Sequence, residues 1–185
     1  MAPLIVFIGP RRAGKTSLFA QLFNDEGFDA TEVGPTMETT VRRYQVQVRC
    51  RAASVDVVDA PNIRHNRFLD EASGAVLVLD SGDLGPLETQ LKRLRLVGIP
   101  ALVVLNKRDL CRDYESATDL ANAFGQAWDP SWSFAQTCGL DGVDGAFARA
   151  FDELAIRILG GLRSPRSRQD TSPEPWPRSP REISG

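Results

Sequence analysis

The residues that decide the fold are LIVFIGPRRAGKTS, from Leu4 to Ser17. The run from Leu4 to Ile8 is entirely apolar, which is typical of a parallel strand covered on both faces. It leads directly into Gly9 to Thr16, which fits the pattern G-x-x-x-x-G-K-[ST]. From Lys15 to Phe23 the apolar side chains recur at helical spacing. A strand, a glycine-bounded loop and a helix in this order predict a phosphate-binding loop.

Strand-like and helix-like stretches alternate along the chain after this loop. Tyr44 to Arg49 alternates polar and apolar residues, which predicts an edge strand that pairs with the next strand as a hairpin. The runs expected to form central strands are Ser54 to Val58, Ala75 to Leu79 and Ala101 to Leu105. The expected covering helices are Leu87 to Leu96, Glu115 to Trp128 and Val143 to Leu159. The pattern indicates a doubly wound α/β domain with a mixed sheet, mostly parallel, one antiparallel edge strand, and helices on both faces.

The phosphate loop assigns roles to several residues. Gly9 and Gly14 allow its tight turn, Lys15 reaches the β- and γ-phosphate oxygens, and the Thr16 hydroxyl can ligate Mg²⁺. Asp59 ends an apolar strand beside the loop and can hold the hydration shell of Mg²⁺. The residues expected to contact the phosphates are Gly9, Arg12, Ala13, Gly14, Lys15, Thr16 and Ser17.

A second motif, Asn106-Lys107-Arg108-Asp109, follows another apolar strand. The carboxylate of Asp109 can accept two hydrogen bonds from guanine, at N1–H and the 2-amino group, and adenine does not offer that pair. The aliphatic stem of Lys107 can lie over the base, and Asn106 can tie this loop to the phosphate loop. After a phosphate loop and an Asp-tipped strand, the motif predicts guanine recognition.

Length and composition fit one domain and a tail. The 185 residues are 42% hydrophobic and carry a net charge of −2, which gives no positive field for a nucleic-acid backbone. No apolar run is long enough to span a membrane, and we expect no lipid anchor. From residue 161 to residue 185 the chain is rich in Ser, Pro and Arg, so we expect a disordered tail after a domain of residues 1–160. We expect a cytoplasmic protein without a direct membrane anchor or a nucleic-acid partner, reaching membranes only through another protein.

With these motifs in order, the chain from Leu4 to Leu159 resembles a small P-loop GTPase of the Ras-like class. The segment from Val33 to Val41 is similar to the first switch of ADP-ribosylation-factor-like proteins and of the signal recognition particle receptor β subunit. The resemblance implies that Thr36 binds Mg²⁺ in the GTP state, with Thr39 and Thr40 as alternatives. It also implies that Thr137 and Cys138, after an expected strand from Trp132 to Ala135, form the last guanine-contacting loop through backbone N–H groups.

The chain departs from this family at the second switch, usually written D-x-x-G-Q. Here Asn62 stands where a glycine donates its N–H to the γ-phosphate, and Ile63 stands where glutamine orients the attacking water. Isoleucine has no group that could orient water. His65, the only histidine, could replace it as a catalytic residue or could simply be solvated. Arg11 and Arg12 could crowd the γ-phosphate or donate charge to it.

These observations predict a guanine-nucleotide switch that binds GTP or GDP with Mg²⁺ and hydrolyses GTP slowly. The switch is expected to signal to a protein effector and to be controlled by regulatory proteins. The alternative is an interaction subunit that holds GTP without cycling, as the receptor β resemblance implies. A P-loop kinase for a small acceptor is a third reading, and the motif from Asn106 to Asp109 argues against it.

Overall fold

The computed structural model describes residues 2–23, 37–61, 65–110, 129, 132–138 and 145–161. The strands are β1 (Leu4–Ile8), β2 (Thr40–Val48), β3 (Arg51–Asp59), β4 (Gly74–Asp80), β5 (Ala101–Asn106) and β6 (Ser133–Gln136). The helices are α1 (Lys15–Leu22), α2 (His65–Glu71), α3 (Leu87–Val97) and α5 (Gly145–Gly161), with a 3₁₀ turn η2 (Arg108–Leu110). Strands and helices therefore alternate, as the sequence predicted. None of the helices in these ranges is long and apolar enough to cross a membrane.

The six strands form one sheet in the order β2-β3-β1-β4-β5-β6. Only β2 runs antiparallel to its neighbour, with Thr40 opposite Asp59, and the remaining neighbours are parallel. The predicted mixed sheet with one antiparallel edge is thereby confirmed. Because β1, β3, β4 and β5 are parallel, their carboxyl ends lie at one edge of the sheet, where α/β proteins bind ligands.

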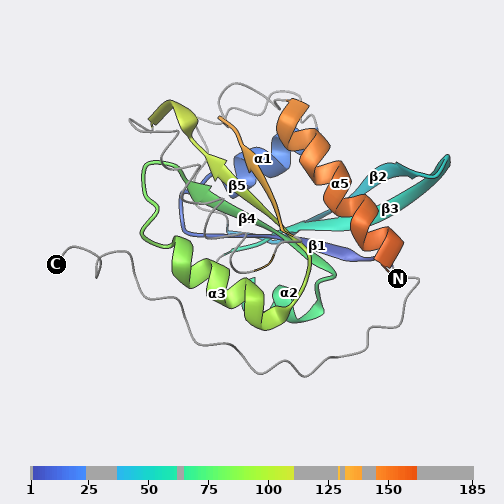
Figure 1. Ribbon diagram of the computed structural model, residues 1–185, viewed down its shortest axis with the longest axis horizontal. Helices are drawn as coiled ribbons and strands as arrows, with labels where there is room; N and C mark the ends of the chain where they lie inside the picture. The colour runs from blue at the N-terminus through green and yellow to red at the C-terminus, as the bar shows by residue number, and fades with distance from the viewer. Residues whose placement is uncertain are drawn as a thin grey trace.

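Helices cover both faces of the sheet (Figure 1). On one face, α1 and α5 pack against alternate residues of the central strands, including Phe7, Val57 and Leu102. On the other face, α2 and α3 pack against the intervening residues, including Ile8, Val58 and Val103. Each central strand is thus apolar on both sides, which explains the continuous apolar runs in the sequence.

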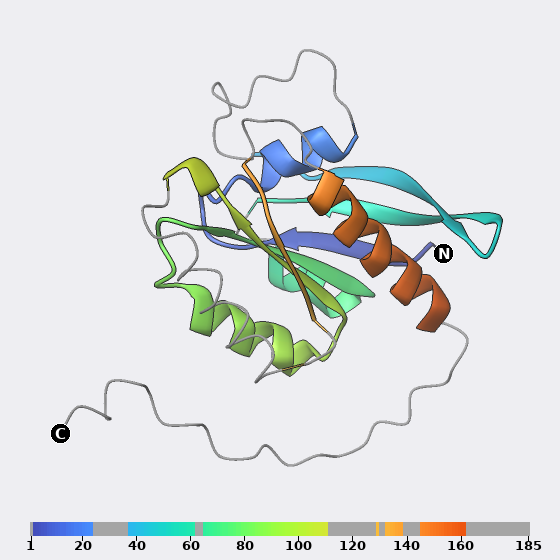
Figure 2. The same cartoon turned by 45° about the horizontal axis from the view of Figure 1, so that its top comes forward.

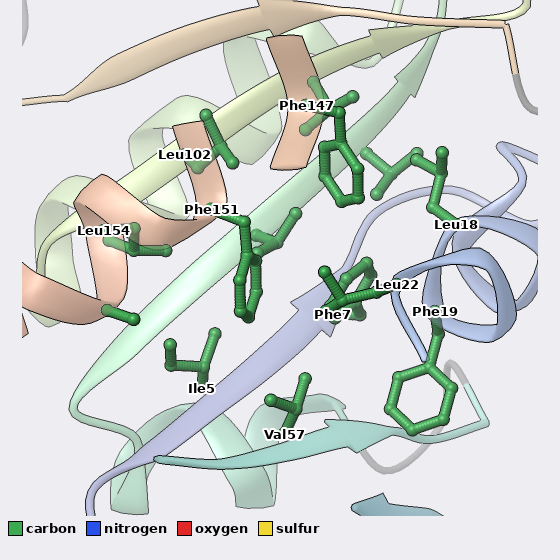
Figure 3. Packing of buried hydrophobic residues seen from close by; sticks show 14 of the residues in the cluster. Ile5, Phe7, Leu18, Phe19, Leu22, Val57, Leu102, Phe147, Phe151 and Leu154 are labelled. Carbon is green, nitrogen blue, oxygen red and sulfur yellow. The ribbon is translucent and has the colours of Figure 1, made fainter. Parts of the chain in front are cut away.

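An aromatic cluster lies between α1, α5 and the sheet. The ring of Phe7 meets the ring of Phe19 edge-on at a centroid distance of 5.9 Å and lies 6.3 Å from that of Phe151. Figure 3 shows these side chains with Phe147 and Leu18 in the same layer. All five are buried, so the first helix after the phosphate loop is anchored by its apolar face.

Tyr44 on β2 connects the hairpin of β2 and β3 to α5. The Tyr44 hydroxyl donates a hydrogen bond to Asp152 Oδ1 at 2.8 Å, and its ring meets that of Phe151 edge-on at 5.0 Å. Burial, reinforced by the Asp152 hydrogen bond, raises the pKa of Tyr44 to about 12. Tyr44 therefore stays protonated, and the middle of β2 is held against α5.

Several predicted boundaries were wrong by a few residues. Arg49 was expected in the edge strand, but it lies with Cys50 in the turn between β2 and β3, and both have left-handed φ values of 48° and 63°. β6 begins one residue later than expected, at Ser133, and α5 includes Gly161, which had been assigned to the tail. The predicted helix from Glu115 to Trp128 and the tail beyond Gly161 lie outside the described residues.

Candidate nucleotide-binding site

The loop between β1 and α1 has a backbone that only glycine fits at two positions. Gly9 has φ 137°, and a Cβ there would overlap the backbone oxygen of Val78 on β4. Gly14 has φ 91°, and a Cβ there would overlap Asn106 Nδ2. Both glycines therefore bring the loop close to the ends of neighbouring strands, where its N–H groups and the start of α1 can face an anion.

Lys15 begins α1, and its side chain is buried. Its Nζ donates hydrogen bonds to the carbonyl oxygens of Gly9 at 3.2 Å and Pro10 at 2.7 Å. Burial lowers the pKa of Lys15 to about 8, while the charge of Asp59 opposes this shift. The ammonium group thus lies against the loop in a poorly solvated place, where a phosphate would restore its charged form.

Thr16 and Asp59 connect α1 with the end of β3. The Thr16 hydroxyl donates to Asp59 Oδ2 at 2.7 Å, while Asp59 Oδ1 is buried with no hydrogen-bond partner in the described parts of the chain. Burial raises the pKa of Asp59, and the Thr16 hydrogen bond and the charge of Lys15 oppose the shift. A hydroxyl beside a carboxylate with a spare oxygen fits Mg²⁺ bound partly through water.

The described residues contain no group of three His, Cys, Asp or Glu side chains that could enclose a metal by itself. Of the described residues, Thr16 and Asp59 would therefore leave most coordination positions of Mg²⁺ to water and to other oxygen ligands. This arrangement is usual for Mg²⁺, which keeps several waters and binds through substrate phosphates.

Asn106, the last residue of β5, is almost completely buried and joins the two loops. Its Nδ2 donates a hydrogen bond to the carbonyl oxygen of Ala13 at 2.9 Å. Its own carbonyl oxygen accepts hydrogen bonds from Ser81, from the hydroxyl at 2.6 Å and the backbone N–H at 2.9 Å. The tie predicted from Asn106 to the phosphate loop is present.

Lys107 and Asp109 are each held by a residue from a different strand end. Lys107 has a left-handed φ of 62°, and its Nζ contacts Asp80 Oδ2 at 2.8 Å. Asp80 Oδ1 in turn accepts a hydrogen bond from the Gly82 backbone N–H at 2.9 Å. Asp109 is exposed, and its Oδ1 accepts a hydrogen bond from the Cys138 thiol at 3.0 Å. The loops after β4, β5 and β6 therefore form one connected unit.

The structure brings together most of the predicted site residues at this edge. One group, at the loop between β1 and α1, contains Gly9, Ala13, Gly14, Lys15, Thr16 and Asp59. A second group, after β5 and β6, contains Lys107, Asp109, Thr137 and Cys138, and Asn106 connects the two groups. Arg11 and Arg12 are exposed in the loop, and Ser17 is buried in α1. Thr36, Asn62 and Ile63 lie outside the described residues, as does the side chain of His65.

Asp80 is a candidate site residue that was not predicted from the sequence. The signal that could have revealed it is a carboxylate that ends an apolar strand next to β5, because β4 pairs with β5 so that Asp80 stands opposite Asn106. Its partner Lys107 follows Asn106 directly, which places the two charges at one edge of the sheet.

Asp80→Asn should lower GTP affinity by about three- to tenfold, because an amide can accept from Gly82 but loses the charge that holds Lys107. Isothermal titration calorimetry would measure the change. Asp83→Asn is the matched control, since the Asp83 carboxylate likewise accepts a hydrogen bond from a backbone N–H, that of Gly85, and forms no ion pair with a lysine within the described part of the chain. Equal affinities for wild type and Asp80→Asn would refute the role of Asp80.

A six-stranded α/β sheet with a phosphate loop after its first strand and N-K-x-D after its fifth defines a P-loop GTPase domain. Residues 4–107 match the model of the family described as 50S ribosome-binding GTPase, and the chain belongs to that family. GTP binding and hydrolysis are the activity of this family. The P-loop GTPase class predicted from the sequence is thus confirmed.

Two curated proteins show the extent of this similarity. The chain is 30% identical over 115 residues to the tRNA modification GTPase MnmE of Heliobacterium modesticaldum, which covers 57% of the chain and 25% of that protein. It is 28% identical over 135 residues to the GTPase HflX of Escherichia coli, which covers 63% of the chain and 31% of that protein. The matched region spans only about a quarter to a third of these relatives.

Proposed function

We propose that this chain is a guanine-nucleotide switch that binds GTP or GDP and hydrolyses GTP slowly. The observation that carries the proposal is the hydrogen bond from Asn106 Nδ2 to Ala13 O, which joins the base loop to the phosphate loop. In a nucleotide that contacts both loops, the base would be hydrogen-bonded by Asp109 and the phosphates would be bound by Lys15.

Mg²⁺ completes the proposed site. Thr16 and the spare oxygen of Asp59 support a position for the ion at the end of β3. Thr36 is the proposed third protein contact, supplied by the sequence before β2. When bound, Mg²⁺ would neutralise charge on the phosphate oxygens, while Lys15 and the loop N–H groups hold the same phosphates in place.

Slow hydrolysis is proposed from the residues after Asp59. Asn62 and Ile63 replace the glycine and glutamine that the Ras-like class uses to sense the γ-phosphate and to orient water. His65, at the start of α2, is the proposed replacement for the missing catalytic side chain. The exposed side chains of Arg11 and Arg12 could donate charge to the γ-phosphate or exclude such a charge from a partner.

The segment from Val33 to Val41, which runs into the start of β2, supports a subclass like the ADP-ribosylation-factor-like proteins or the receptor β subunit. We propose that an effector protein reads this segment in the GTP state, and that exchange and activating proteins act on the same surface. The replacement of glutamine by Ile63 also favours a second function, an interaction subunit that holds GTP without cycling.

The test is single-turnover hydrolysis by the purified full chain with Mg²⁺, comparing GTP with ATP and recording the nucleotide that copurifies. We expect GTP to bind, ATP not to bind, and GDP to form slowly. Ile63→Gln should raise the GTP hydrolysis rate at least about tenfold, because an amide can orient the attacking water. Ile63→Leu is the matched control and should leave the rate unchanged.

The results of these measurements distinguish the slow GTPase switch from the non-cycling subunit. GTP that copurifies and stays intact for hours, with no gain from Ile63→Gln, would favour the non-cycling subunit. Binding of ATP as tight as that of GTP would refute guanine recognition by Asp109. Hydrolysis by the wild-type chain as fast as by Ile63→Gln would contradict the proposed slow turnover.

A further inference from the structure

β2 is an edge strand of the sheet, and its far half has only one neighbouring strand. No other strand of the described chain lies beyond β2. On β3, the residues that pair with β1 begin at Asp56, so residues 51–55 pair with β2 alone. Figures 1 and 2 show this hairpin projecting past the start of β1. A two-stranded ribbon is only marginally stable by itself, so a further strand would stabilise it.

The main-chain groups on the outer edge of β2 belong to every second residue. Val48 and Arg51 pair on either side of the two-residue turn, and a pair in that position exchanges both main-chain hydrogen bonds. Such pairs alternate with pairs whose N–H and C=O groups point away from the partner strand. Counted back from Val48, the residues with outward groups include Arg43, Gln45 and Gln47, and no turn or loop of the described chain hydrogen-bonds to their backbone.

The far half of β2 lacks the features that usually keep a further strand from pairing with an edge. These features are a charged side chain, a proline or a bulge. Residues 44–48, with the sequence YQVQV, contain no charged residue and no proline. Nine consecutive residues of β2 pair with nine of β3 in unbroken register, so this hairpin has no bulge. Gln45 and Gln47 are exposed. The edge is therefore open to another strand.

We propose that β2 pairs with β2 of a second copy of this chain, in antiparallel orientation about a two-fold axis at Gln45. Such an interface uses the same strand on both subunits and closes as a dimer. The axis sets Arg43 opposite Gln47 of the second copy, and Tyr44 opposite Val46 of the second copy. The inference goes beyond the proposed function, because none of these residues belongs to the nucleotide site.

The pattern of β2 is complementary to itself in this register. Antiparallel pairing keeps residues of one face opposite residues of the same face. The exposed side chains of Gln45 and Gln47 would therefore stay together on the outer face. Tyr44 and Val46, which pack on the core beside α5, would meet their counterparts on the inner face. An aromatic residue opposite a β-branched residue stabilises an antiparallel pair.

The arginines of β2 select the position of the axis. Arg42 and Arg43 are its only charged residues. An axis at Arg43 or Tyr44 would place the two Arg43 side chains directly opposite or diagonal to each other, which is destabilising. The axis at Gln45 separates them by four residues along the strands, or roughly 13 Å. Each guanidinium group then lies opposite a neutral amide and keeps its ion pair with Asp56.

Sedimentation equilibrium of the full chain, from about 1 to about 100 μM, tests the association. We expect a monomer–dimer equilibrium in this range. Gln45→Pro removes one outward N–H but no hydrogen bond to β3, so it should raise the dissociation constant of the dimer at least about tenfold. Gln45→Thr is the matched control, because it keeps the N–H and favours a strand. It should leave the constant within about threefold of wild type.

Cysteine cross-linking tests the register. In a Cys50→Ser background, Gln45→Cys places two thiols opposite each other across the axis, with Cα atoms about 5.5 Å apart, a separation that a disulfide spans. Gln47→Cys, the matched control, places the two thiols four residues apart along the strands. Both variants retain the same other cysteines. Oxidised glutathione should therefore yield a covalent dimer from Gln45→Cys and little from Gln47→Cys.

A wild-type chain that stays monomeric up to about 100 μM would overturn the inference. So would a Gln45→Pro variant that dimerises like wild type, or equal cross-linking of the two cysteine variants. Gln45→Pro should bind GTP as wild type does, which shows that the variant is folded. A wild-type chain that dimerises but binds no GTP would refute the proposed function and leave the dimer intact. The two failures are therefore distinguishable.

Discussion

Replacement of Lys15 by methionine should weaken GTP binding by at least about a hundredfold, because the variant loses the buried ammonium group that lies against the phosphate loop and would pair with the phosphates. Methionine has a similar length and no charge, and Lys15 is only 6% exposed. The variant should therefore fold at least as stably as the wild type, since a poorly solvated charge is removed. Calorimetry for GTP and chemical denaturation without nucleotide would measure the two effects, and tight GTP binding by the variant would contradict the assigned role.

The same lysine gives a pH dependence. The pKa of Lys15 in the free protein is lowered to about 8, and a bound phosphate would raise it. Above that pH, Lys15 must therefore take up a proton when GTP binds. GTP affinity should therefore be constant below about pH 7 and fall by roughly fourfold between pH 6.5 and 8.5. Lys15→Arg, which stays charged over this range, should show no such decline. A flat wild-type profile would show that Lys15 is already fully charged in the free protein.

Gly9→Ala should lower the free energy of unfolding by about 3 kcal/mol or more. The φ of 137° is strained for any residue with a Cβ, and the added carbon would overlap the backbone oxygen of Val78, which cannot move without disturbing β4. Gly98→Ala is a matched control, because Gly98 also has a positive φ, of 65°, but nothing lies within 4 Å of an added Cβ. It should cost about 1 kcal/mol from backbone strain alone.

Urea denaturation of both glycine variants separates strain from overlap. The free energy of unfolding of Gly9→Ala should be lower than that of Gly98→Ala by at least about 2 kcal/mol. Gly9→Ala should also lose GTP affinity, because the loop that carries the N–H groups must shift. Equal stabilities for the two variants would mean that the loop can move away from Val78 without a penalty.

The parts of this protein that could be predicted from sequence are those fixed by local pattern. A buried parallel strand reads as a continuous apolar run, so β1, β4 and β5 were located to within a residue. Asp59 and Asn106 could be assigned to the site because polar residues at the carboxyl ends of parallel strands gather at one edge.

The parts that could not be predicted depend on strand order and on single turns. Asp80 lies opposite Asn106 only because β4 and β5 are neighbours in this register. The sequence of either strand alone does not predict this pairing. The thiol of Cys138 meets Asp109 through the pairing of β5 with β6. Arg49 was placed in a strand because its left-handed backbone is rare for a residue with a side chain.

The hydrogen bond between Asn106 and Ala13 has a consequence for ligands smaller than a nucleotide. Guanosine alone would occupy the base loop, and inorganic pyrophosphate alone would occupy the phosphate loop. Because a hydrogen bond joins the two loops, each fragment would also help to order the loop that binds the other fragment. Binding of the first fragment lowers the entropy loss that the second fragment must cause, so the two fragments bind with positive cooperativity. Each fragment raises the affinity for the other by the same factor. The covalent nucleotide would combine these two half-sites, so that much of its affinity comes from the connection between them.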